Sequence, residues 1–300
     1  MRLGLTVPAF RWPGGPARIG PILGRIARDA DTHGLASLWL MDHYFQVTIN
    51  GRAEDPMLDG YAALSFAAAL TSDISLGTLC TGVTYRHPGL LGKLVTTLDV
   101  LSGGRAYLGI GAAWYREEHD GLGVTFPPMA ERFERLEETL QITGRMFAND
   151  DSPYIGTHYR LARPLNSPPP LGRVDTARPH PPILVGGTGE RKTLRLVAQY
   201  ADACNLYDAP DLPHKLAVLR EHCDRLGRPY EEIEKTVLSQ FKLKDDPRTD
   251  PAASVAHLER LAALGIDHVI VSLPAVHNEN AVISLGKVAA EVADLVPAGR

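Results

Sequence analysis

The chain has 300 residues, of which 44% are hydrophobic and 22% are charged, and its formal net charge is -4. That length suits one large or two ordinary domains. Charges of both signs are interspersed, which argues against nucleic acid and membrane partners and favours a small molecule. The N-terminus lacks a secretory signal pattern, and no segment approaches the roughly 20 apolar residues of a membrane span. We expect a soluble, cytoplasmic protein whose three scattered cysteines lie in the core and bind no metal.

Short β-rich runs alternate with longer helical patterns along the whole chain, which is typical of βαβ units and a parallel sheet. The predicted strands are residues 3–8, 36–41, 75–81, 106–111, 183–186, 203–207, 236–242 and 268–273. The predicted helices are residues 21–33, 61–70, 89–101, 131–147, 191–200, 212–226, 252–264 and 281–295. Eight repeats without a dinucleotide-type break favour a (β/α)8 TIM barrel over an open sheet, in one domain covering residues 1–300.

The longest irregular stretch, residues 148–182, is rich in proline and contains one predicted hairpin at residues 154–161. It joins the fourth predicted helix to the fifth strand, so barrel geometry predicts a place at the bottom face, where stability rather than chemistry resides. We interpret it as an insertion and not as an active-site lid. The loops after strands one, two, four and seven open onto the top face, and we expect the functional residues there.

The second strand ends at Asp42 and His43, which places an acid and an imidazole at the carboxyl end of a barrel strand. Catalytic and cofactor-binding groups of barrel enzymes lie at such positions. The alternative is that Asp42 caps a turn and that His43 is an ordinary surface histidine. We favour the catalytic interpretation because the two residues are adjacent and follow the strand directly.

The third and fourth strands end in small residues, which let a planar ligand approach the backbone closely. The residues at these two ends are Thr78, Leu79, Cys80, Gly111, Ala112 and Trp114. The glycines could instead only relieve crowding between strands. They are not a dinucleotide-binding fingerprint, since no third glycine and ribose-binding acid follow at the required spacing.

The fifth strand runs into a glycine-rich turn and then into a helix. The turn consists of Gly186, Gly187, Thr188 and Gly189. Successive backbone amides at a helix N-terminus form an anion site suited to a phosphate. Arg191 and Lys192 in the first turn would add positive charge to it. A purely structural turn is the alternative.

The seventh strand alternates so that Gln240 and Lys242 point into the mouth if its apolar residues pack outward on the helices. A lysine at this position also raises a Schiff-base aldolase as a rival. Lys242 has no evident acid-base partner, which disfavours that class.

Aromatic residues gather in the upper loops and suggest a pocket that accepts rings. They are Phe10, Trp12, Tyr44, Phe45, Trp114 and Tyr115. As substrate-pocket residues we predict Phe10, Trp12, Tyr44, Tyr115, Gln240 and Lys242. Aromatic side chains in loops also serve as local plugs. The following stretch, residues 116–119, lacks the spacing of a zinc protease, and we interpret it as the start of a solvated loop.

Four segments together resemble the luciferase-like monooxygenase superfamily: residues 39–43, LGTLCTGVTYRHP at 76–88, LDVLSGGRAYLGIGAAW at 98–114, and residues 183–189. They are similar above all to its actinobacterial branch that depends on the deazaflavin coenzyme F420. The similarity extends from Met1 through at least the sixth βα unit, and the motifs come in the same order.

The resemblance implies that a deazaflavin or flavin ring rests on a bulge at the end of strand three, where a non-prolyl cis peptide commonly occurs. The matching residues are Leu79 and Cys80. It also implies that Asp42 and His43 contact the ring or substrate, and that the turn at residues 186–189 binds the phosphate. Coenzyme F420 is the expected cofactor, FMN is the alternative, and a homodimer is the expected assembly.

The expected reaction is hydride transfer from reduced F420 to an unsaturated or carbonyl-bearing acceptor, with His43 as proton donor or ring contact and Asp42 orienting it. An FMN-dependent monooxygenase and a non-enzymatic flavin-binding protein are the alternatives. Sugar-phosphate dehydrogenases of this group carry a catalytic glutamate where this chain has Trp114, which disfavours that substrate class. We expect Arg191 and Lys192, together with Arg86 and Lys93 near strand three, to meet an anionic tail longer than the phosphate of FMN.

Overall fold

The computed structural model describes residues 1–172, 179–241, 251–273 and 275–300. Its parallel strands form one sheet in the order β3-β2-β1-β11-β10-β9-β8-β5-β4, which the pairing of β3 with β5 closes into a barrel. These strands are β1 Arg2–Val7, β2 Ser37–Leu40, β3 Ser75–Thr78, β4 Thr81–Gly82, β5 Ala106–Gly111, β8 Ile183–Gly186, β9 Ala203–Tyr207, β10 Glu234–Gln240 and β11 His268–Ser272. Because β3 and β4 both pair with β5, they are two parts of one barrel strand. The predicted (β/α)8 barrel is confirmed.

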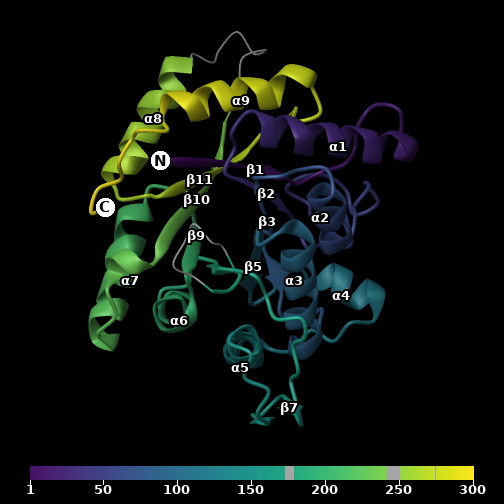
Figure 1. Ribbon diagram of the computed structural model, residues 1–300, viewed down its shortest axis with the longest axis vertical. Helices are drawn as coiled ribbons and strands as arrows, with labels where there is room; N and C mark the ends of the chain where they lie inside the picture. The colour runs from purple at the N-terminus through teal and green to yellow at the C-terminus, as the bar shows by residue number, and fades with distance from the viewer. Residues whose placement is uncertain (173–178, 242–250, 274) are drawn as a thin grey trace.

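Helices surround the barrel (Figure 1). They are α1 Pro16–Thr32, α2 Gly60–Ala68, α3 Pro88–Ser102, α4 Arg116–Leu122, α5 Met129–Phe147, α6 Thr193–Tyr200, α7 Leu212–Leu226, α8 Pro251–Ala263 and α9 Glu279–Glu291, with a short 3-10 helix at Tyr230–Glu232. The expectation of a solvated loop at residues 116–119 is wrong, because α4 begins there and two of its polar residues are buried. Among the described residues, no helix is long and apolar enough to cross a membrane.

Apolar side chains fill the barrel interior beneath the mouth. The cluster consists of Trp39, Tyr107, Leu184, Ala203 and Ile270, one from each of five strands. The indole of Trp39 has room there because Gly77 faces it, and a Cβ on Gly77 would lie 2.5 Å from that ring. The outer faces of the strands pack against the helices in a second, larger apolar cluster. The mouth therefore has a packed apolar floor.

A chain of polar contacts continues below this floor. Trp39 Nε1 donates to Ser37 Oγ at 2.6 Å, and Ser37 Oγ lies 2.9 Å from His268 Nε2. The other ring nitrogen of His268 lies 3.0 Å from Glu234 Oε1. Burial lowers the pKa of His268, so its neutral form is favoured inside the barrel.

The proline-rich insertion contains the predicted hairpin, formed by β6 Tyr154–Ile155 and β7 Arg160–Leu161. Its position differs from the expectation. The amides of Thr157 and Tyr159 donate to Glu138 of α5, and the Tyr159 ring packs on His87, which caps the N-terminus of α3. Helix N-termini follow the mouth ends of the strands. The prediction of a bottom-face position is therefore wrong for this hairpin, because Glu138 draws its tip up the side of the barrel.

Candidate active site at the barrel mouth

A bulge interrupts the third barrel strand at the mouth. The peptide that joins Leu79 to Cys80 is cis, as predicted, and the strand resumes at Thr81. Thr78 Oγ1 lies 2.7 Å from Thr81 Oγ1 and donates to Gly109 O at 3.0 Å. These two contacts hold both sides of the bulge to each other and to β5.

The strand ends around the bulge carry almost no side-chain bulk. A Cβ on Gly186 would lie 2.5 Å from Cys80 Sγ, and a Cβ on Gly111 would lie 3.4 Å from Gly186 O. Three neighbouring strands thus present backbone and one thiol to the mouth. Burial raises the pKa of Cys80 to about 12, so the thiol stays neutral. This cradle fits the face of a flat, uncharged ring, and added side chains would fill it.

His43 follows β2, the neighbour of the strand that carries the bulge, and is held by a buried carboxylate from α4. Its Nδ1 lies 2.6 Å from Glu118 Oε1. The Glu118 side chain is 0% exposed, and its second oxygen accepts from the amides of Tyr44 and Phe45 at 2.8 and 3.2 Å. Tyr85 OH donates to the first oxygen. The residue that orients His43 is therefore Glu118, and the prediction that Asp42 orients it is wrong.

Sequence reasoning missed Glu118. It lies 75 positions after His43, and nothing in the local pattern marks it as buried. A usable signal was present, since Arg116-Glu117-Glu118 has the acidic first turn of a helix N-terminus. A helix at that place would have brought Glu118 to the mouth.

Asp42 faces a different partner, which corrects its predicted role. Its carboxylate forms an ion pair with Arg86, whose guanidinium also reaches Tyr44 OH and Asp59 Oδ2 at 3.0 Å each. Burial raises the pKa of Asp42, and the neighbouring Arg86 opposes this rise. The other carboxylate oxygen, Oδ1, is buried and makes no hydrogen bond to any described residue. Asp42 is thus a buried carboxyl group whose ion-pair partner is Arg86.

The turn after β8 has the shape expected of an anion site. Gly187 adopts φ 127°, and its amide donates to Asn205 O at 3.1 Å. In the part of the chain that the structure describes, no residue accepts a hydrogen bond from the amides of residues 188–191. α6 begins at Thr193, two residues later than predicted, and the Arg191 side chain is exposed. Free amides and an exposed guanidinium together suit a phosphate.

Several predicted pocket residues lie elsewhere. Phe10 and Trp12 are 2% and 8% exposed and pack on each other in the core, so they are plugs and the prediction that they line the pocket is wrong. Tyr115 is also buried, whereas Tyr44 is half-buried beside Arg86. Gln240 ends the inward-facing alternation of β10 and is exposed at the mouth, and its place in a substrate pocket stays a prediction. Lys242 lies outside the described residues.

The two cations near strand three are already engaged. Arg86 binds two carboxylates, and Lys93 Nζ donates to Ser167 O at 2.5 Å. The ion pairs of Arg86 contradict its predicted contact with an anionic tail, whereas the same expectation for Lys93 stays a prediction. At the mouth itself, Tyr207 is a further residue that the sequence did not suggest. It ends β9 and is 58% exposed. Burial raises the pKa of Tyr207, and the Cys80 thiol makes a smaller contribution to that rise.

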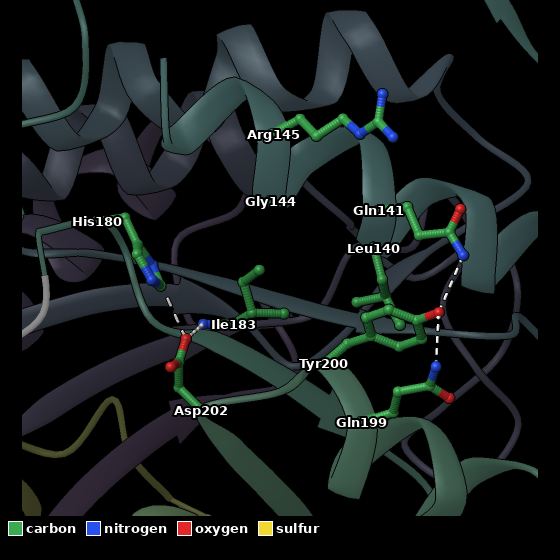
Figure 2. A pocket seen from close by; sticks show the side chains of 9 residues that line it. All are labelled: Leu140, Gln141, Gly144, Arg145, His180, Ile183, Gln199, Tyr200 and Asp202. Atoms are coloured by element: carbon green, nitrogen blue, oxygen red, sulfur yellow. Dashed lines mark hydrogen bonds and ion pairs between the residues drawn. The ribbon is translucent and has the colours of Figure 1, made fainter. Parts of the chain in front are cut away.

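A cavity of about 390 Å³ opens at the other end of the barrel, between α5 and α6 (Figure 2). Its polar side chains are mostly paired, since Tyr200 OH accepts from both Gln141 and Gln199. It lies at the N-terminal ends of the strands, away from the bulge and from His43. The mouth is therefore the candidate site.

Comparison with known proteins places this architecture in a family. The sequence model of the luciferase-like monooxygenases matches residues 1–281. The chain belongs to the luciferase-like monooxygenase family. An F420-dependent glucose-6-phosphate dehydrogenase from Kineococcus radiotolerans is 29% identical over 236 residues, which are 75% of this chain and 65% of that protein.

Solved structures of other proteins share the fold. The monooxygenase RslO1 from Streptomyces bottropensis superposes with a TM-score of 0.77 at 20% identity, covering 98% of both chains. An F420-dependent secondary alcohol dehydrogenase, solved with an F420-acetone adduct, superposes with a TM-score of 0.74 at 16% identity, covering 100% of this chain and 99% of that one. The family predicted from the sequence is confirmed.

Proposed function

We propose that the chain is an F420-dependent oxidoreductase that moves a hydride between the deazaflavin and a small organic acceptor bearing a carbonyl or conjugated double bond. The observation that carries this proposal is the Glu118–His43 pair beside a cradle almost free of side chains. The F420-dependent relatives support the choice of cofactor. The acceptor class follows from the need for a proton beside the ring, which an imidazole can supply.

The cradle and the turn after β8 would hold the cofactor. The bulge at Leu79 and Cys80, with Gly111 and Gly186, would carry the ring, and the amides of residues 188–191 would bind the phosphate. Once bound, the deazaflavin supplies or accepts the hydride. The remaining chemistry belongs to side chains of this protein.

His43 is the proposed proton donor. A carboxylate only accepts hydrogen bonds, so Nδ1 carries a proton toward Glu118 and the second nitrogen, Nε2, exchanges the mobile proton. Nε2 makes no hydrogen bond to any residue in the described part of the chain, and the His43 side chain is 12% exposed. The contact with Glu118 fixes the orientation of the imidazole ring. The pair thus holds one proton at a defined atom beside the cradle.

Asp42 and Arg86 are proposed to shape the mouth and not to move protons. Arg86 is fixed between Asp42 and Asp59, and its guanidinium lies 4.9 Å from the centre of the Tyr61 ring. This ion-paired wall at one side of the mouth keeps water away from Asp42, which is buried. His43, by contrast, keeps one nitrogen available.

An FMN-dependent monooxygenase is the second candidate, since a family neighbour of known structure is a monooxygenase. The turn after β8 supports the choice of F420. Arg191 is exposed there, and the Lys192 ammonium lies 5.3 Å from the centre of the Phe133 ring while its residue remains exposed. These cations could meet a tail with more negative charge than the single phosphate of FMN. Each exposed contact is worth about 0.3 to 1 kcal/mol, so several must act together.

Fluorescence titrations of the purified chain with F420 and with FMN, followed by oxygen measurements during turnover, test the proposal. We expect tighter F420 binding and reduction of an enone without oxygen uptake. Arg191→Gln should narrow the preference by about 2- to 5-fold, which is the value of one exposed contact. Tighter FMN binding with oxygen uptake coupled to product would establish the monooxygenase instead. A homodimer is part of the same proposal, and light scattering of the purified protein measures it.

A further inference from the structure

The chain turns sharply where β5 leaves the barrel. Ala113 has φ 58°, and among the described residues only Asn149 shares a positive φ without being glycine. A residue with a Cβ adopts this conformation rarely and needs its surroundings to maintain it. The turn decides where the next side chain, Trp114, points.

Arg132 of α5 maintains the turn. Its Nη1 donates to Ala112 O at 3.2 Å and also to Ala113 O, and its Nε donates to Pro127 O at 3.1 Å. The residue is 5% exposed, its guanidinium lies 4.2 Å from the centre of the Phe126 ring, and no described carboxylate pairs with it. A buried arginine whose guanidinium donates its hydrogen bonds to backbone carbonyl oxygens holds that backbone in place, as a clamp does. None of the roles assigned above uses it.

The clamped turn presents an aromatic surface next to His43. Trp114 is 58% exposed, although its ring stacks on the Tyr115 ring with centroids 5.2 Å apart. The same indole meets the His43 ring edge-on at 5.6 Å. Tyr115 is fixed in turn, since its OH donates to Glu117 Oε2 at 2.9 Å. One ring is therefore supported from behind and open in front, beside the imidazole that holds the proton.

We infer that Trp114 is the platform on which the acceptor stacks, and that Arg132 is a positioning residue that sets its orientation through Ala113. The acceptor class is then a planar, conjugated carbonyl compound carrying an aromatic ring. This inference rests on the proposed function, because only an oxidoreductase has a hydride acceptor. The stacking itself is a binding property of this chain. The exposed indole favours the acceptor side of the mouth over the cofactor contact that the sequence suggested for Trp114.

The test is calorimetric binding of two matched enones, benzylideneacetone and its cyclohexyl analogue, with oxidised F420 present and again without it. Both carry the same enone, and only the first has a flat ring. The wild-type chain should prefer the aromatic compound by about 3- to 10-fold, the range for one aromatic pair. Trp114→Leu should abolish that preference and Trp114→Phe should keep part of it, with F420 affinity unchanged in both.

An unchanged preference in Trp114→Leu overturns the platform, and so does a large loss of F420 affinity in that variant, which would assign the indole to the cofactor. Failure of the proposed function looks different. In that case the chain would bind the enones with the expected preference but would not reduce them with F420.

Arg132→Lys tests the clamp, because an ammonium cannot reach all three carbonyl oxygens. The preference for benzylideneacetone should fall about as far as in Trp114→Leu. Acrylamide quenching of tryptophan fluorescence should change too, since Trp12 and Trp39 are buried and Trp114 is exposed. Adding Ala113→Gly should restore part of the preference, because glycine adopts this conformation without a clamp. A lower melting temperature with unchanged preference and quenching would reduce Arg132 to a structural residue.

Discussion

Replacing Glu118 by glutamine would reverse the hydrogen-bonding pattern around His43. A glutamine oxygen could still accept from the amides of Tyr44 and Phe45, which now bind Oε2. Its NH2 group would then face His43 Nδ1 and Tyr85 OH, where an acceptor is needed. Neutral His43 would turn to the other tautomer, with the proton on Nε2 and the lone pair directed at the amide. Its exchangeable nitrogen would no longer be able to accept a proton.

We expect the turnover number to fall by about 10²- to 10⁴-fold, or roughly 3 to 5 kcal/mol of barrier, which is the range for a general acid-base group. Folding stability should fall less, by about 1.5 to 3 kcal/mol for the lost charge-assisted contact. Stopped-flow measurement of acceptor reduction at several pH values gives the turnover number, and urea unfolding gives the folding stability. Nitrogen NMR shifts of His43 report the tautomer.

Asp120→Asn is the matched control, because Asp120 lies on the same helix but is exposed. Its ion pair with Arg116, in an i,i+4 arrangement, is long at 3.9 Å and therefore weak. Its turnover should stay within about 2-fold of the wild type. If folded Glu118→Gln protein kept more than half of the wild-type turnover at every pH, the carboxylate would have no part in proton transfer.

Three more predictions follow from buried contacts. Gly186→Ala places a Cβ 2.5 Å from Cys80 Sγ, so the thiol must shift and the surface of the cradle must change. F420 titration should then show affinity reduced by at least about 10-fold (one step of 1.4 kcal/mol), and equal affinity would show that no ring rests there. Arg86→Gln leaves Asp42 buried without its cation and should lower the free energy of unfolding, measured in urea, by about 3 to 5 kcal/mol. The double variant with Asp42→Asn should recover most of this loss. A loss of similar size in both proteins would contradict the pairing. Because burial lowers the pKa of His268, this side chain takes up a proton in the unfolded chain before it does so in the folded one as the pH falls. The free energy of unfolding should therefore decline below about pH 6.5, by up to roughly 1.4 kcal/mol per pH unit, and His268→Gln should flatten that decline. An equally steep decline in the variant would assign the effect to other groups.

The barrel was predictable because its strands are short apolar runs whose order the alternating helices preserve. The bulge at Leu79 and Cys80 came from the family resemblance, and the turn after β8 from its glycines. α4 was not predictable by apolar periodicity, because it has only seven residues and the two it buries are Glu118 and His119. A polar residue buried by a distant partner leaves no periodic pattern in the sequence.

Partners across the mouth were the main source of error. Asp42 and Arg86 follow neighbouring barrel strands and are 44 positions apart, so their proximity was open to inference, but Arg86 was assigned to an anionic tail instead. Phe10 and Trp12 show the opposite difficulty. An aromatic residue in a loop after a strand can equally line a pocket or close it, and only the packing of the two rings on each other decides.

The segment between β5 and α5 has a consequence for how such barrels diversify. It carries Trp114 and Glu118 together, while His43, the bulge and the turn after β8 lie on other connections. Exchanging residues 112–128 for the corresponding segment of a relative would transplant the aromatic surface and the histidine's carboxylate in one step. The strands and their apolar floor would stay as they are. The roles proposed here for Trp114 and Glu118 would then pass together to the new protein, and Arg132, which lies outside the segment, would still bind its backbone.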